Sequence, residues 1–165
     1  MSEELHVDNV SISAEPQLHK STQWAMKALD EREWKYDVAP HTEERPSDRI
    51  TLSFRADNMP GIRIYLFFNP DCRRVAMYVY DIIKLPKATK EELFNLIQTM
   101  HENYIFGRWV FFEKDSTLQV EWYAHMEDNI ESARLVAAGV SRMAALVDEA
   151  HPTLMKTCAE LGLFK

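Results

Sequence analysis

The chain has 165 residues, of which 46% are hydrophobic and 27% charged, as is usual for a globular domain that can bury its own core. Its formal net charge of −7, and the lack of any long Lys or Arg run, argue against nucleic acid or an anionic membrane surface as partner. No apolar run approaches the roughly 20 residues needed to cross a bilayer, and the start of the chain lacks the pattern of a secretory signal. We therefore expect a cytoplasmic protein that binds proteins or small molecules.

The first part of the chain predicts an arm followed by a helix and a short strand. Residues 1–12 are expected to form an N-terminal arm, loose or docked on the body, ahead of a single domain over residues 13–165. A helix is expected to begin near Ser13-Ala-Glu-Pro16 and to end near Asp30, because Ser is a good N-cap and Pro is tolerated in a first turn. Alternation within residues 33–40 predicts a short strand.

Three further runs of alternating apolar and polar residues predict the centre of a sheet. They cover residues 49–56, 62–69 and 74–83, and short turns join them. Strands joined by short turns pair in antiparallel fashion.

The second half of the chain predicts two helices separated by a hairpin. Thr89 and Glu92 have the spacing of a capping box and indicate a helix start. Residues 108–125 read as a hairpin, and Asp128 is expected to cap a long final helix that Pro152 kinks or interrupts. The resulting order is helix, strands, helix, hairpin, helix. This order predicts an α+β fold with an antiparallel sheet of five or six strands and helices packed on one face.

The face of this sheet that points away from the helices is the candidate functional surface. Alternation places the rings of Tyr65, Phe67, Tyr78 and Tyr80 on it, with Arg108 beside them. Tyr and Phe clusters with polar surroundings are typical of association surfaces. Two interpretations stay open: the rings contact a partner chain, or the arm or the sheet's own twist covers them.

Catalytic and metal sites are not expected. No two of the six histidines have the HxxxH spacing that brings two ligands to one helical face. His101 is better explained by the end of its helix, and Asp128, near His125, by its capping role. The chain has no glycine-rich phosphate loop, so we predict no catalytic residues, no metal and no cofactor.

Several stretches resemble the YbjN family of bacterial proteins, which has the fold of the type III secretion chaperones. They are ALDEREWKYDV, ITLSFRADN, IRIYLFFN and KATKEELFNLIQTMHENYIFGRW, within about residues 16–157. The resemblance implies a non-enzymatic module, and family members are described as regulators of sensory transduction. Relatives in the chaperone superfamily are dimers that hold extended segments of client proteins.

We therefore expect a protein-binding module, either a chaperone-like protein or a regulatory adaptor in bacterial sensory transduction, that acts as a homodimer. Its partner would be a protein or a client peptide. Two alternatives remain: a small-molecule sensor or enzyme with a pocket between sheet and helices, and a purely structural dimeric subunit. A pocket lined by Asp81, His101 and His125 would favour the first alternative.

Overall fold

The computed structural model describes residues 17–71 and 73–164. Three helices and six strands follow in the expected order of helix, strands, helix, hairpin and helix. They are α1 (Lys20–Asp30), β1 (Tyr36–Ala39), β2 (Asp48–Phe54), β3 (Ile62–Phe68), β4 (Arg74–Lys84), α2 (Lys90–Asn103), β5 (Arg108–Phe112), β6 (Thr117–His125) and α3 (Ile130–Glu160). The predicted arm and the predicted helix start at Ser13 lie outside the described residues.

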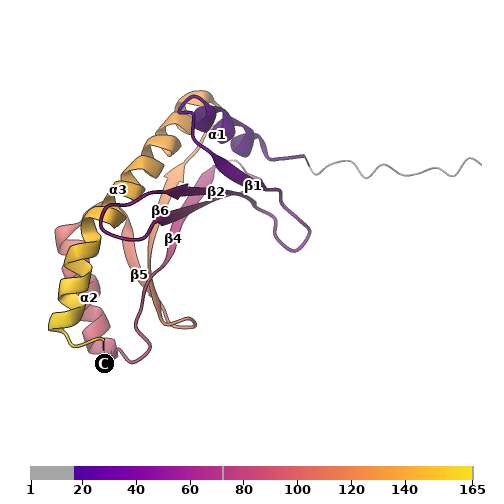
Figure 1. Cartoon of the computed structure of the whole chain (residues 1–165). Helices are drawn as coiled ribbons and strands as arrows, with labels where there is room; N and C mark the ends of the chain where they lie inside the picture. The colour runs from indigo at the N-terminus through magenta and orange to yellow at the C-terminus, as the bar shows by residue number, and fades with distance from the viewer. Residues whose placement is uncertain (1–16, 72, 165) are drawn as a thin grey trace, which may run out of the picture.

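The six strands form one antiparallel sheet in the order β1-β2-β3-β4-β6-β5. The α+β class and the antiparallel sheet predicted from alternation are confirmed. The strands turn from nearly horizontal in β1 and β2 to nearly vertical in β5 and β6, and α2 and α3 lie together on one side (Figure 1). A strong twist of this kind follows from the handedness of individual strands.

The core lies between the helices and the inner face of the sheet. Inward side chains of the strands alternate with outward ones as the sequence predicts, so that Ile64, Leu66 and Met77 have no exposed surface. Most of the core comes from Ile50, Leu52, Ile62, Ile64, Leu66, Phe68, Val75, Met77, Val79, Leu118 and Val120 of the sheet and from Val136, Val140, Met143, Val147 and Leu154 of α3. Each such aliphatic side chain stabilises the fold by roughly 1.5–3 kcal/mol relative to an exposed one.

Helix α2 begins with the capping box that its sequence predicts. The Thr89 hydroxyl accepts the Glu92 backbone N–H at 3.3 Å, and a Glu92 carboxylate oxygen accepts the Thr89 backbone N–H at 2.8 Å. At the other end of this helix, the backbone N–H of Trp109 donates to Nε2 of His101 at 3.0 Å. His101 thus joins the end of α2 to β5.

The expected caps of the other two helices are corrected by the structure. Helix α1 begins at Lys20, and residues 17–19 precede it without helical structure. Helix α3 is capped by Asn129, whose side chain accepts the Ser132 backbone N–H at 2.8 Å, and not by Asp128. Helix α3 also continues through Pro152.

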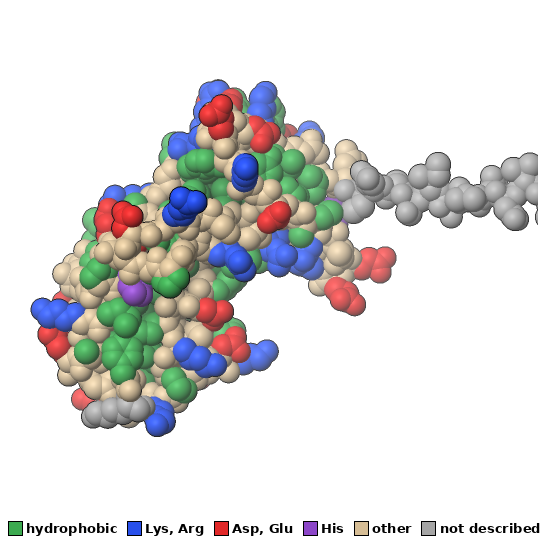
Figure 2. All heavy atoms as spheres, viewed as in Figure 1, with side chains coloured by type: hydrophobic (Ala, Val, Ile, Leu, Met, Phe, Trp, Pro, Cys, Tyr) green, Lys and Arg blue, Asp and Glu red, His purple; other side chains and the backbone are tan. Residues whose placement is uncertain are grey.

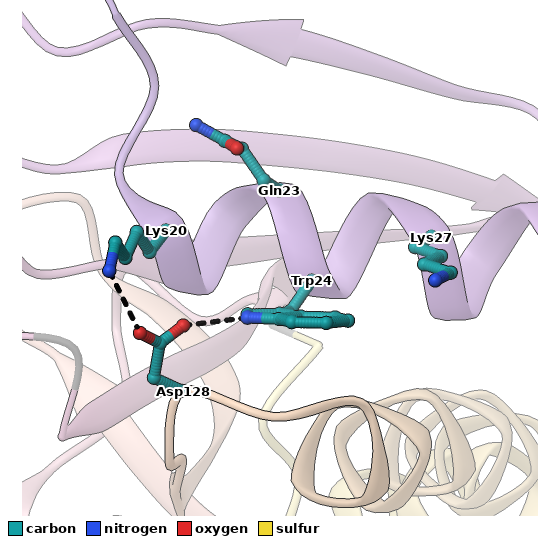
Figure 3. Close-up of a pocket in the computed structure, with 5 residues that line it drawn as sticks. All are labelled: Lys20, Gln23, Trp24, Lys27 and Asp128. Carbon is teal, nitrogen blue, oxygen red and sulfur yellow. Dashed lines mark hydrogen bonds and ion pairs between the residues drawn. The ribbon is translucent and has the colours of Figure 1, made fainter.

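Asp128 instead connects α1 to the start of α3. Its carboxylate accepts the indole N–H of Trp24 at 2.6 Å and lies 3.3 Å from Nζ of Lys20, with Trp24 between Asp128 and the turn that carries Lys27 (Figure 3). Because both oxygens face donors on α1, this side chain is used in packing two helices together.

Gly139 brings α3 close to β6. A Cβ atom at this position would lie 2.3 Å from Cζ3 of Trp122, where real contacts are longer than 3.0 Å. The helix therefore depends on glycine here for a close approach to a ring, although glycine weakens helices elsewhere.

We expect Gly139→Ala to lower the free energy of unfolding by roughly 1–3 kcal/mol, because the overlap with Trp122 outweighs the better helix propensity of Ala. Urea unfolding measures the change. Trp122→Leu alone should also lower the free energy of unfolding. In the double variant the decrease should be smaller than the sum of the two single decreases, since the smaller Leu side chain leaves room for the new methyl group. Additive losses would contradict the assigned contact.

Candidate functional site: the aromatic outer face of the sheet

The outer face of the sheet carries a continuous cluster of rings. Tyr65 lies opposite Tyr78 in the register of β3 and β4, and Tyr80 and Tyr123 extend the cluster along β4 and across to β6. The ring centroids of Tyr65 and Tyr80 are 5.2 Å apart, those of Phe67 and Tyr78 5.7 Å, and those of Tyr78 and Tyr80 5.2 Å. The four rings predicted from alternation thus lie together. We call Tyr65, Phe67, Tyr78, Tyr80 and Tyr123 the aromatic patch.

No described helix covers the aromatic patch, since α2 and α3 lie on the opposite side of the sheet (Figure 1). Tyr80 is 37% exposed and Tyr123 44%. Tyr65, Phe67 and Tyr78 are half-buried by one another. The patch offers a partner large rings with little rotational freedom to lose.

A buried carboxylate lies at the β6 side of the patch. Glu121 is opposite Tyr78 in the sheet and only 7% exposed. Its oxygens accept from Arg108 at 2.6 Å, from the Gln119 amide at 2.9 Å and from the Tyr123 hydroxyl at 3.3 Å. Burying a carboxylate is costly unless it is paired, and Arg108 on the edge strand β5 supplies the pairing. Arg108, predicted as a partner contact, therefore also neutralises Glu121.

Two hydroxyls of the patch, those of Tyr78 and Tyr80, stay protonated at neutral pH. Burial, with a smaller effect from Glu121 and the neighbouring tyrosines, raises the pKa of Tyr80 to about 12. Burial and the 3.1 Å hydrogen bond with the Tyr123 hydroxyl raise the pKa of Tyr78 above its ordinary value. These groups bind as neutral hydroxyls.

Two open hollows meet at Tyr78 and Tyr80. One, of about 460 Å³, is lined by Ser47, Phe67, Asn69, Arg74, Ala76, Tyr78, Tyr80 and Tyr123. The other, of about 540 Å³, is lined by Tyr78, Tyr80, Asp81, Val110, Phe112, Asp115, Thr117, Gln119 and Glu121. We call the first the arginine-side hollow and the second the acidic-side hollow. The outer face therefore carries an arginine at one end and carboxylates at the other.

Sequence reasoning missed several residues of this face. The partner contacts predicted from sequence do not include Tyr123, Arg49 or Arg74. The guanidinium carbon of Arg49 lies 5.9 Å from the ring centroid of Tyr65, and that of Arg74 lies 5.9 Å from Tyr123. The alternation of β2 and β4 could have indicated both arginines.

A second cluster brings together His19, His41 and Asp48. The Asp48 carboxylate is fully buried and accepts four hydrogen bonds of 2.7–2.8 Å: from the backbone N–H groups of His19 and His41, from the Thr22 hydroxyl and from Nδ1 of His41. The two imidazole rings stack 4.3 Å apart. These three residues are the one set of potential metal ligands among the described residues.

This cluster has the features of a structural connection. One nitrogen of each ring and one Asp48 oxygen lie within 4.8 Å of one another, but four donors already use the lone pairs of the Asp48 carboxylate. Burial raises the pKa of Asp48, but the hydrogen bonds from Thr22, His41 and His19 together outweigh burial and lower the pKa below its ordinary value. The first turn of α1 contains no acidic residue, so Asp48 supplies the negative charge that a helix N-terminus favours.

The residues named for an alternative enzyme or sensor pocket do not come together. Asp81 lines the acidic-side hollow, His101 a groove between α2 and β5, and His125 a groove between β6 and α3. The hollow on α1 is lined by Lys20, Gln23, Trp24, Lys27 and Asp128 (Figure 3). Its one carboxylate already binds Trp24 and Lys20.

Comparisons with models of protein families, with curated proteins and with solved structures found no match to this chain. The resemblance to the YbjN family stays a prediction. No helix in the described part of the chain is both long and apolar enough to span a membrane.

We expect Asp48→Asn to lower the free energy of unfolding by roughly 2–4 kcal/mol at pH 7, since the amide cannot accept all four hydrogen bonds. Because the folded-state pKa of Asp48 is lowered, the carboxylate stabilises the fold above its unfolded pKa of about 4, and this contribution is lost as the pH falls further.

Urea unfolding of wild type and variant from pH 7 down to pH 3 should show the difference shrinking below about pH 4. Asp37→Asn, at an exposed position on β1, is the matched control and should change stability by no more than about 0.5 kcal/mol. A difference that stays constant over this pH range would show that the charge of Asp48 has no such role.

Proposed function

We propose that this protein is a non-enzymatic protein-binding module whose aromatic patch binds a segment of a partner protein. The observation that carries the proposal is the continuous cluster of rings on a sheet face that no described helix covers. Tyr and Arg are the residues most enriched at the energetic centres of protein interfaces.

The charges around the patch indicate the chemistry of the partner. The chain as a whole has a net charge of −7, but Arg74 lines the arginine-side hollow and Arg49 lies opposite Phe67, another lining residue, in the sheet register. The one carboxylate within the patch, Glu121, is neutralised by Arg108. An acidic segment with apolar side chains fits this end of the face, because its carboxylates would meet the arginines and its apolar groups the rings.

The resemblance to the YbjN family supports the biological role within this proposal. We propose a chaperone-like protein or a regulatory adaptor of bacterial sensory transduction, acting in the cytoplasm as a homodimer. The patch suits either role, since both require a surface that binds segments of other proteins without changing them chemically.

We expect Tyr65→Ser combined with Tyr78→Ser to abolish partner capture while the fold is retained, since both side chains lie on the outer face. Affinity capture from the native cells, with bound proteins quantified by mass spectrometry, measures the loss. Phe94→Ser is the matched control, because Phe94 is 67% exposed on α2, away from the patch. Partners kept by the control but lost from the double variant support the proposal. Capture that survives the double variant contradicts it.

A different surface offers a site for the second copy in the proposed homodimer. A mostly apolar groove between β6 and α3 is lined by Phe106, Trp122 and Leu135, among others, and Leu135 is 71% exposed. The core of a homodimer interface is more apolar than the rest of the surface. Of the aromatic patch only Tyr123 lines this groove. A second copy bound there would leave the other four rings free.

We expect the purified protein to be a dimer by light scattering, and Leu135→Asp to convert it to a monomer because a buried, unpaired carboxylate opposes association. Phe94→Asp introduces the same charge at an exposed apolar site on α2 and should leave the mass unchanged. If the wild-type protein is a monomer in solution, the proposed homodimer is wrong. If the Leu135→Asp variant is still a dimer, the dimer interface does not include this groove.

A further inference from the structure

Arg108 is paired with Glu121, but three other arginines of the outer face lack acidic partners within the described part of the chain. Arg49, Arg63 and Arg74 take part in none of its ion pairs, and Nε of Arg49 is buried without a hydrogen-bond acceptor. A buried donor without an acceptor is unfavourable, so the site is more stable when an acceptor is supplied. The arginine-side hollow therefore lacks a negatively charged occupant.

A residue just before α1 contacts the loop that borders this hollow. Nε2 of His19 lies 2.9 Å from the backbone oxygen of Pro46, the residue before Ser47. The Ser47 hydroxyl donates to the Asn69 side chain at 2.8 Å, and both residues line the arginine-side hollow. His19, two residues after the first described residue, therefore contacts a neighbour of the hollow.

The sequence of the segment that precedes Gln17 matches the chemistry of the hollow. Residues 1–16 contain Glu3, Glu4, Asp8 and Glu15 and no Lys or Arg. Aliphatic side chains recur at alternate positions in two pairs, Leu5 with Val7 and Val10 with Ile12. Sixteen residues can span up to about 53 Å, whereas the seven-residue strand β3 is about 24 Å long. The segment is therefore long enough to cross the patch.

We propose that residues 3–15 of this chain dock on its own aromatic patch at the arginine-side hollow. Their carboxylates meet Arg49 and Arg74, and their aliphatic side chains cover the rings of Tyr78 and Tyr123. The acidic-side hollow, with Asp81 and Asp115, repels the same segment, which confines docking to the arginine side. The regulatory consequence rests on the proposed function. A partner that binds the aromatic patch must first displace residues 3–15.

Hydrogen exchange of the full chain, followed by mass spectrometry, tests the docking without any partner. Amides of residues 3–15 should exchange roughly tenfold or more slowly than those of a free peptide of the same sequence. Arg49→Gln with Arg74→Gln should abolish this protection, and Arg142→Gln, on the helix side, should retain it. A second variant leaves the sheet itself unchanged. The full chain with Glu3→Gln, Glu4→Gln, Asp8→Asn and Glu15→Gln should lose the protection as well.

Exchange at the free-peptide rate in the wild type would overturn the inference, as would protection that survives both sets of changes. Protection that increases with protein concentration would place the segment on a second copy and overturn docking within one chain. If residues 3–15 are protected but Tyr65→Ser with Tyr78→Ser leaves partner capture unchanged, the proposed function fails and the docking stands. If both hold, neutralising the four acidic residues should increase partner capture several-fold, because the competing segment is weakened.

Discussion

The buried carboxylate of Asp48 is the interaction on which the arrangement of the molecule depends. Asp48 is the first residue of β2. Its carboxylate accepts hydrogen bonds from His19 and Thr22 at the start of α1 and from the backbone and ring of His41 in the loop after β1. A charged group buried without these partners would be costly, so the helix, the loop and the strand hold one another in place. This connection joins the start of α1 and the loop after β1 to the first residue of β2.

The register of the sheet determines the properties of the candidate site. Because side chains alternate, a shift of one residue in β3 or β4 would bury Tyr65 and Tyr78 and expose Leu66 and Met77. Strong burial on the inner face therefore maintains the aromatic patch on the outer one. The pairing of Glu121 with Arg108 then allows a carboxylate to lie among rings. These features together form the surface that we propose as a binding site.

Some elements could be predicted from local sequence because their causes are local. The capping box of Thr89 and Glu92 needs only four residues, and the alternation in β2, β3 and β4 requires only neighbouring positions. The existence of α1 and its end at Asp30 were predicted correctly. The predicted start of α1 and the predicted cap at Asp128 were wrong because distant partners decide them. Asp48 supplies the negative charge at the start of α1 from another element, and Trp24 and Lys20 take the carboxylate that was expected to cap α3.

The sequence by itself determined the class of the fold, the inward and outward faces of the central strands and the rings of the candidate surface, since all of these follow from periodicity. Only the tertiary structure decided that Arg49 and Arg74 flank those rings, that Glu121 is buried and neutralised, and that His19 contacts Pro46 next to the arginine-side hollow. The physical reason is that these features join residues far apart in the chain. The strength of an ionic contact depends on the distance between the two charges and on their burial. The spacing of residues along the sequence gives neither quantity.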